Sequence, residues 1–164
     1  MPTNSIDSLD HLAGHIEEAV RICREHVAEG GVPFSGIVVR DGRILGTGFN
    51  RVHEDGDPTA HAEVVALRAA ARKAGRFGTA GSTLIASGEP CVLCYLAALY
   101  FDVEHIVFAA DRKTAGAYGF DYGSSYSIFS TDPTTWPLKV THAPIDGHEA
   151  PFQDFLTRRK GAIR

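Results

Sequence analysis

Two short motifs in this sequence contain residue types that bind metal ions and carry protons. One is a His-x-Glu sequence formed by His61 and Glu63, and the other is a Cys-x-x-Cys sequence formed by Cys91 and Cys94. Histidine and cysteine are typical zinc ligands, and three protein ligands leave the fourth tetrahedral position open for water, as in a catalytic site. His61, Cys91 and Cys94 are therefore the predicted ligands of one Zn²⁺ ion per subunit.

Glu63 carries a carboxyl group two residues after the predicted histidine ligand. Zinc lowers the pKa of a bound water to about 7, and a carboxylate beside that water is suited to general acid–base catalysis. We predict that Glu63 takes the proton of the water and passes it on to the substrate. In this scheme Glu63 is catalytic and is not a ligand.

Each motif also has a simpler interpretation. A Cys-x-x-Cys sequence is also typical of a redox pair or of half a structural zinc site, and a His-x-Glu sequence is common by chance. A structural site needs a fourth Cys or His, whereas the remaining histidines form no second spaced pair. A non-catalytic zinc domain that serves as an interaction module has no need of Glu63. The two motifs together favour a catalytic zinc.

The surrounding sequence predicts how these residues meet. Asp57 and Pro58 predict an N-cap and a first helical residue, for a helix that continues to about Lys73. Glu89 and Pro90 likewise precede a predicted helix over residues 91–100. Cysteines three apart share a helix face, and the partial positive charge of a helix N-terminus favours thiolates. The predicted ligands thus lie in the first turns of two helices.

The hydrophobic pattern predicts the other elements. Residues 6–29 form an amphipathic helix with Cys23 on its apolar face, which places this cysteine in the core. The remaining expectations are strands at 36–40 and 44–49 joined by an Asp-Gly hairpin, a polar loop at 50–57, strands at 82–87 and 105–109, a Gly/Ser/Tyr-rich stretch at 111–135, a last strand at 138–141 and a last helix at 151–160.

This order predicts an α/β fold, a three-layer α/β/α sandwich in which strands separated by helices pair in parallel after the opening hairpin. With 164 residues, of which 44% are hydrophobic, the chain suits a single domain over residues 1–164. Three cysteines are too few for a disulfide framework, which indicates a reducing, cytoplasmic compartment. The longest apolar run, residues 91–101, is too short to span a membrane, and the N-terminus does not resemble a signal peptide.

The motifs resemble the cytidine deaminase-like superfamily, for which His-x-Glu…Pro-Cys-x-x-Cys is a signature. The likeness extends from Pro33 to about Thr157, and residues 33–34, 57–63 and 89–94 look like the base-deaminase branch. That branch holds bacterial guanine deaminases, fungal-type cytosine deaminases and tRNA adenosine deaminases. The resemblance implies a mixed five-stranded sheet, an obligate zinc, and homodimers or larger oligomers.

The resemblance also implies a substrate pocket. Asn50 matches the family asparagine that binds the base, although it also suits a turn that ends the hairpin. Phe34 either stacks on a flat base or packs in the core, and Glu89 either shapes the pocket or caps its helix. Ala62, Asp121 and Tyr122 complete the predicted substrate-binding set.

The sequence at 119–121 and 151–153 looks most like the guanine deaminase group, in which a second acidic residue follows the aspartate. Here Tyr122 occupies that position, where it would narrow the pocket toward a smaller ring. Asp121, His148 and Glu149 are either replacements for the missing acid or surface loop residues. The predicted function is a zinc-dependent hydrolytic deaminase of free nucleobases (guanine-type, cytosine, isoguanine or triazine-like) that replaces a ring amino group by oxygen and releases ammonia.

A tRNA-specific adenosine deaminase is the alternative function. Residues 111–116 and the basic residues 158–160 are similar to that subgroup. Against it, the net charge is −4, whereas an RNA-binding surface is expected to be basic. The expected partners are therefore a small-molecule nucleobase and a second copy of the chain, with no membrane and no nucleic acid. The apolar helices at 64–71 and 92–100 either supply the dimer face or are buried within one subunit.

Overall fold

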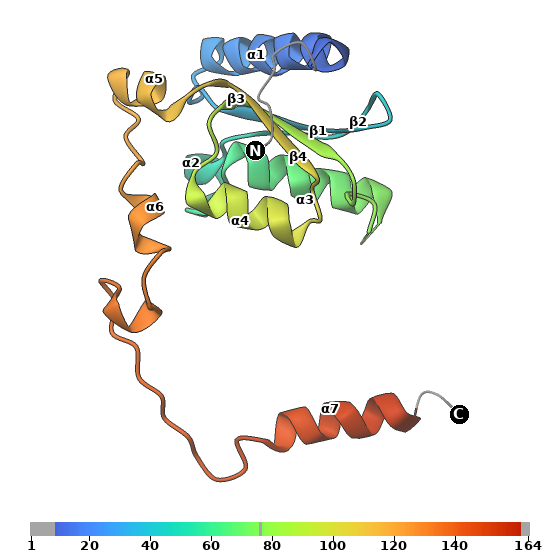
Figure 1. Ribbon diagram of the computed structural model, residues 1–164, viewed down its shortest axis with the longest axis vertical. Helices are drawn as coiled ribbons and strands as arrows, with labels where there is room; N and C mark the ends of the chain where they lie inside the picture. Colours follow the sequence, from blue (N-terminus) through green and yellow to red (C-terminus); the bar gives the residue numbers. More distant parts are fainter. Residues whose placement is uncertain (1–8, 76, 162–164) are drawn as a thin grey trace, which may run out of the picture. The chain divides into compact units, whose positions relative to one another are not determined.

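The computed structural model describes residues 9–75 and 77–161. It divides into two compact units, one that ends at Ser130 and one that begins at Thr131. The first unit contains the sheet and helices α1 to α6, and the second contains α7 (Ala150–Gly161) (Figure 1). The expectation of a single domain over residues 1–164 stays a prediction.

The sheet is mixed and has the strand order β2-β1-β3-β4. These strands are β1 (Ser35–Arg40), β2 (Arg43–Phe49), β3 (Thr83–Gly88) and β4 (His105–Ala110). The predicted hairpin of β1 and β2 is confirmed, and β3 and β4 pair in parallel as expected. In contrast, β3 pairs antiparallel with β1, because the helical connection after β2 carries the chain across β1 to its far side.

The expected fifth strand is wrong, since the sheet has four strands in the described part of the chain. Residues 138–141 alternate between apolar and polar side chains, which is why they were expected to be a strand. They belong to the second unit, form no ladder, and leave Leu138 and Val140 exposed. Alternation without a neighbouring strand to accept the backbone hydrogen bonds does not produce a sheet.

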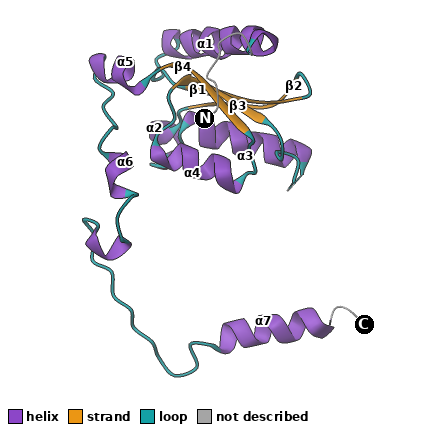
Figure 2. Cartoon of the chain, viewed as in Figure 1, coloured by secondary structure: helices purple, strands orange, loops and turns teal. Residues whose placement is uncertain are grey.

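Helices cover both faces of the sheet, which confirms the three layers (Figure 2). On one face lies α1 (Ala13–Ala28), and on the other lie α3 (Ala62–Ala74) and α4 (Val92–Tyr100). Successive strand residues point to opposite faces. Accordingly Ile37 and Ile85 pack with α1, whereas Val38 and Leu84 pack with α3 and α4.

The first helix agrees with the predicted amphipathic helix where the structure describes it. A 3-10 turn, η2 (Asp10–Leu12), leads into α1, and Cys23 is 7% exposed and so lies in the core as expected. Residues 6–8 of the predicted helix lie outside the described residues.

Helix α3 lies directly on the backbone of β2 because two residues of that strand are glycines. A Cβ atom on Gly48 would lie 2.4 Å from both the carbonyl oxygen of Ala62 and the backbone nitrogen of Ala66. A Cβ on Gly46 would similarly lie 2.4 Å from the nitrogen of Ala70. These two glycines therefore set the position of the helix whose first residues carry the His-x-Glu motif.

Two loops differ from expectation. Residues 50–57 include a short helix, α2 (Val52–Asp55), and α3 begins at Ala62 and not at Pro58. The reason is local, because the Asp57 carboxylate accepts hydrogen bonds from the backbone and the hydroxyl of Thr59 and so closes a separate turn. The stretch 111–135 contains α5 (Arg112–Ala117), α6 (Ser125–Ile128) and the 3-10 turn η3 (Pro133–Thr135).

The last helix, predicted at 151–160, is confirmed as α7. Among the described residues, no helix has both the length and the apolar character needed to cross a membrane.

Candidate metal centre

The two motifs meet where α3 and α4 begin. His61 is the N-cap residue of α3 and Cys91 is the N-cap residue of α4, and both have an extended backbone that turns into the helix. Cys94 follows in the first turn of α4. Because α3 follows β2 and α4 follows β3, and these two strands run in the same direction, both helices start at the same edge of the sheet.

The three ligand atoms have the spacing that a zinc ion requires. The Nδ1 atom of His61 lies 3.3 Å from Sγ of Cys91 and 3.5 Å from Sγ of Cys94, and the two sulfurs are 3.6 Å apart. Tetrahedral zinc, with bonds of about 2.3 Å to sulfur and about 2.0 Å to nitrogen, needs separations of about 3.8 Å between sulfurs and about 3.5 Å from sulfur to nitrogen. The cluster, which is partly to fully buried, is thus positioned to bind a metal ion.

The two cysteines differ in acidity although they are three residues apart. Contact with the Cys94 thiol, reinforced by His61, lowers the pKa of Cys91 to about 4. The same contact and burial raise the pKa of Cys94. Contact with Cys91 also raises the pKa of His61. One thiolate is therefore already favoured in the protein alone, and a metal ion that binds here must displace the proton of the other.

Glu63 lies beside this cluster in the first turn of α3. Its side chain is 5% exposed, and the Cys94 thiol donates a hydrogen bond of 3.3 Å to its Oε2 atom. Burial raises the pKa of the Glu63 carboxyl above its ordinary value. A carboxyl group with a raised pKa holds a proton more readily than an ordinary glutamate, which suits the predicted role of proton carrier.

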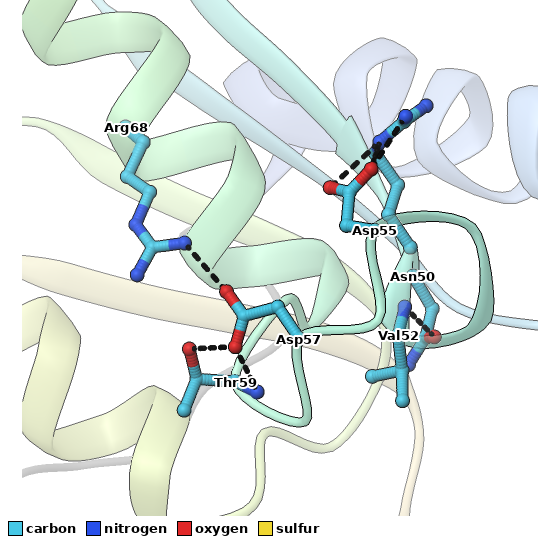
Figure 3. Close-up of polar contacts among 7 residues, drawn as sticks. Asn50, Val52, Asp55, Asp57, Thr59 and Arg68 are labelled. Atoms are coloured by element: carbon cyan, nitrogen blue, oxygen red, sulfur yellow. Dashed lines mark hydrogen bonds and ion pairs between the residues drawn. The ribbon is translucent and has the colours of Figure 1, made fainter.

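Asn50 lies at the end of β2, before the loop that leads to His61. Its side-chain oxygen accepts a hydrogen bond from the backbone nitrogen of Val52, at 3.2 Å (Figure 3). Further along the loop, the Asp57 carboxylate lies 3.6 Å from the Arg68 guanidinium of α3. Because the backbone donor of Val52 orients the amide, the NH₂ group of Asn50 stays available as a donor to a ligand.

A small cavity of about 80 Å³ opens beside the metal-binding cluster. It brings together most of the predicted site residues and is lined by Phe34, Asn50, His61, Glu63, Glu89, Cys91 and Tyr122. Cys94 is buried behind these residues, 3.6 Å from Cys91.

Several other predicted residues do not line this cavity. Ala62 is fully buried against the glycines of the hairpin. Asp121 is exposed and accepts a hydrogen bond from the backbone nitrogen of Gly123. His148 and Glu149 are exposed residues of the second unit.

Glu89 does not cap its own helix, whose N-cap residue is Cys91. Instead its carboxylate accepts a hydrogen bond of 2.7 Å from the backbone nitrogen of Arg112, at the start of α5, and lies 3.8 Å from Nε of the same residue. Glu89 thus joins the pocket to the segment after β4.

Two tyrosines attach this segment to the turn before Cys91. The Tyr122 hydroxyl donates to the carbonyl of Glu89 at 2.6 Å, and the Tyr126 hydroxyl donates to the carbonyl of Pro90. Burial raises the pKa of Tyr122, and it raises the pKa of Tyr126 to about 12, so both hydroxyls remain donors at neutral pH. Tyr126 had no predicted role, and its four-residue spacing from Tyr122 was the available signal.

Comparison with known proteins agrees with this geometry. Residues 11–110 match the cytidine and deoxycytidylate deaminase zinc-binding region. The chain is 32% identical to guanine deaminase from Bacillus subtilis (strain 168), over 84% of this chain and 89% of that protein. A crystal structure of guanine deaminase from Bacillus subtilis superimposes with a TM-score of 0.79 at 31% identity, covering 87% of this chain and 91% of the other.

A tRNA-specific adenosine deaminase from Aquifex aeolicus is 28% identical over 90% of this chain and 95% of its own length. The chain belongs to the cytidine and deoxycytidylate deaminase zinc-binding family. It is a zinc-binding deaminase, which places it among the hydrolases that act on cyclic amidines.

Proposed function

We propose that the protein is a zinc-dependent hydrolytic deaminase of free nucleobases. The observation that carries this proposal is the buried carboxyl of Glu63, which shares one small cavity with His61 and Cys91. A cavity of about 80 Å³ suits a free base better than a nucleotide within an RNA strand. The likeness to a guanine deaminase over most of both chains supports the same class of substrate.

The side chains of the pocket divide the work of the reaction. When bound, zinc supplies a water whose pKa is lowered to about 7. Glu63 would take one proton from that water and pass it to a ring nitrogen as the water oxygen bonds to the amino-bearing ring carbon. It would then pass the second proton of the water to the amino group, which leaves as ammonia, so that oxygen replaces the amino group. Asn50 donates its amide N–H to a ring carbonyl. The rings of Phe34 and Tyr122 contact the face or the edge of the base.

The test is ammonia release by zinc-loaded protein from guanine, cytosine, isoguanine and an aminotriazine, with free nucleosides for comparison. We expect at least one free base to be deaminated and the nucleosides to be much poorer substrates. The Glu63→Ala variant is expected to keep its zinc, measured by elemental analysis, and to lose turnover. Undiminished turnover by this variant would refute the proposed role of Glu63.

Deamination of adenosine in tRNA is the second candidate. The likeness to a tRNA-specific adenosine deaminase over 90% of this chain favours it, as does helix α5, which begins within the run at 111–116 that resembles that subgroup. Against it stands the net charge of −4. A tRNA anticodon stem-loop belongs in the same assay, and ammonia release from the stem-loop alone would favour this second function over the first.

The homodimer also remains a proposal. Of the two apolar helices, α3 buries its apolar face within the subunit, whereas α4 has no charged residue and leaves Leu99 71% and Tyr100 81% exposed. A second copy of the chain that covers this end of α4 would remove apolar surface from water. We also propose a cytoplasmic location, because Cys23, Cys91 and Cys94 are free thiols, and a single catalytic domain over residues 1–164.

A further inference from the structure

The pocket beside the metal-binding cluster is small compared with the free nucleobases that are the candidate substrates. The cavity measures about 80 Å³. By comparison, an apolar cavity of about 150 Å³ in another protein holds a single benzene ring. This pocket has about half that volume, so a single six-membered ring already fills it to its open mouth, and a second, fused ring fits beside the walls only if they move.

Phe34, the first wall, is held from behind. A Cβ atom at Gly88 would lie 3.0 Å from Cε1 and 3.1 Å from Cδ1 of the Phe34 ring, so the ring lies against the strand backbone. The ring of Phe120 contacts it edge to face, with centroids 5.2 Å apart. Phe34 also lines a second cavity of about 430 Å³, so its ring is the partition between a small pocket and a larger space.

Tyr122, the second wall, is fixed at both ends. Its hydroxyl donates to the carbonyl of Glu89 at 2.6 Å, and its own carbonyl accepts a hydrogen bond of 2.7 Å from the Ser125 hydroxyl. Its ring lies 6.4 Å from that of Phe34 at an interplanar angle of 75°. Swinging Tyr122 outward would break the hydroxyl bond and leave a partly buried carbonyl without its partner, which opposes the motion.

We propose that Phe34 and Tyr122 form a fixed aromatic wall that restricts the pocket to monocyclic substrates, namely pyrimidines or triazines that carry a ring amino group and a ring carbonyl. A ring carbonyl suits Asn50, because its side-chain oxygen already accepts from Val52 and its NH₂ group can donate to an acceptor in the pocket. This inference rests on the proposed function and narrows its substrate class.

Cytosine and isoguanine provide a matched test of ring size. Their six-membered rings carry the same amino and oxo groups, and isoguanine differs by its fused five-membered ring. For the zinc-loaded wild type we expect kcat/KM for cytosine to exceed that for isoguanine, and that for guanine, by at least about 100-fold. Phe34→Ala, which opens the partition, and Tyr122→Ala, which removes the second wall, are each expected to lower the cytosine preference at least about 10-fold.

Two controls separate size from chemistry. Tyr100→Ala removes a tyrosine that is 81% exposed at the end of α4 and lines neither cavity, so it should leave the preference unchanged. Binding of cytosine and isoguanine to Glu63→Gln protein, measured by calorimetry, should show the same preference without turnover.

The possible failures are distinct. Comparable wild-type efficiency on cytosine and on either purine would overturn the size limit while leaving the proposed function intact. An unchanged preference in both widened variants would overturn the role of the wall. If no free base releases ammonia and none binds, both the proposed function and this inference are overturned.

Discussion

The pocket has two sides that are built in different ways. The metal side, formed by His61, Glu63, Cys91 and Cys94, comes from the N-cap residues and first turns of two helices that pack on the sheet. The aromatic side, formed by Phe34 and Tyr122 with Phe120 behind them, comes from a loop and from the irregular segment after β4. On the metal side, regular elements fix the side chains; on the aromatic side, individual hydrogen bonds and ring contacts do so.

Because of this difference, we expect the metal side to determine whether the reaction occurs and the aromatic side to determine which substrate is accepted. Ligand atoms must be placed to within a few tenths of an ångström to share one ion, and helices packed on a sheet provide that precision. A wall that selects a substrate has only to exclude volume, so it can vary without loss of the chemistry. Substitutions on the metal side should therefore abolish the reaction, whereas those on the aromatic side should redirect it.

The largest effect is expected for Cys91→Ala. Removal of this thiolate leaves His61 and Cys94 as the only two members of the cluster, too few for a tight zinc site. We expect loss of bound zinc and a fall in turnover of at least about 1000-fold, measured by elemental analysis and ammonia release. Cys23→Ala, at a buried cysteine outside the cluster, is the matched control and should keep its zinc. An active, zinc-replete Cys91→Ala protein would refute the ligand assignment.

The next largest effect is expected at Gly48 of β2, on which the helix α3 of the metal side packs. In Gly48→Ala, the new Cβ meets backbone atoms of α3 at 2.4 Å, so the helix must move away from β2. Overpacking of this kind costs about 1–3 kcal/mol, and here the atoms in the way are backbone atoms that cannot rotate aside. Denaturant unfolding should show the loss of stability, and zinc affinity should fall with it because His61 moves with the start of α3.

Gly14→Ala is the matched control for this substitution. Gly14 lies in α1, and a Cβ there meets nothing within 4 Å. Alanine is the better helix former, so stability should stay the same or rise by up to about 1 kcal/mol. Equal stability of the Gly48→Ala and Gly14→Ala proteins would show that α3 tolerates displacement from β2.

The metal side could be predicted from the sequence because its signals are local. His61 and Glu63 are two residues apart, Cys91 and Cys94 are three apart, and apolar helical segments follow both motifs. The start of α3 was misplaced because Asp57 and Pro58 have the residue types of a helix start, while the hydrogen bonds of Asp57 to Thr59 close a separate turn instead.

The aromatic side could not be predicted in the same way. The contacts of Phe34 with Gly88 and Phe120 join residues more than fifty positions apart, with no periodic pattern between them. The hydroxyl of Tyr122 bonds to a backbone carbonyl, which every residue possesses, so the sequence carries no mark of its partner. The fifth strand failed for a related reason, since an alternating pattern does not show whether a neighbouring strand exists.

Asn50→Asp tests a residue that lies between the two sides. The aspartate keeps an oxygen to accept the hydrogen bond from Val52, so the loop should retain its conformation, but it loses the NH₂ donor. We expect kcat/KM to fall about 10- to 100-fold, mainly through KM, because a ring carbonyl would face a carboxylate. Full activity with Asp together with a loss with Ala would instead make Asn50 a turn residue, which was the alternative interpretation.

The smallest effect is expected for Tyr126→Phe. Tyr126 belongs to the segment that supplies the aromatic side, and its hydroxyl bonds to the turn before the metal ligand Cys91. This variant keeps the ring, over which the Arg112 guanidinium lies 4.6 Å from the centroid, and removes only the hydroxyl that donates to the carbonyl of Pro90. Loss of one such hydrogen bond costs about 1 kcal/mol. Because Pro90 directly precedes Cys91, zinc affinity should fall by about 5-fold, which is that free energy expressed as a ratio. The preference between cytosine and isoguanine should stay unchanged.

Tyr118→Phe, at an exposed ring, controls for the loss of a hydroxyl in the same segment. A changed substrate preference with unchanged zinc affinity would assign Tyr126 to the aromatic wall and would mean that the two sides are less separate than their construction indicates.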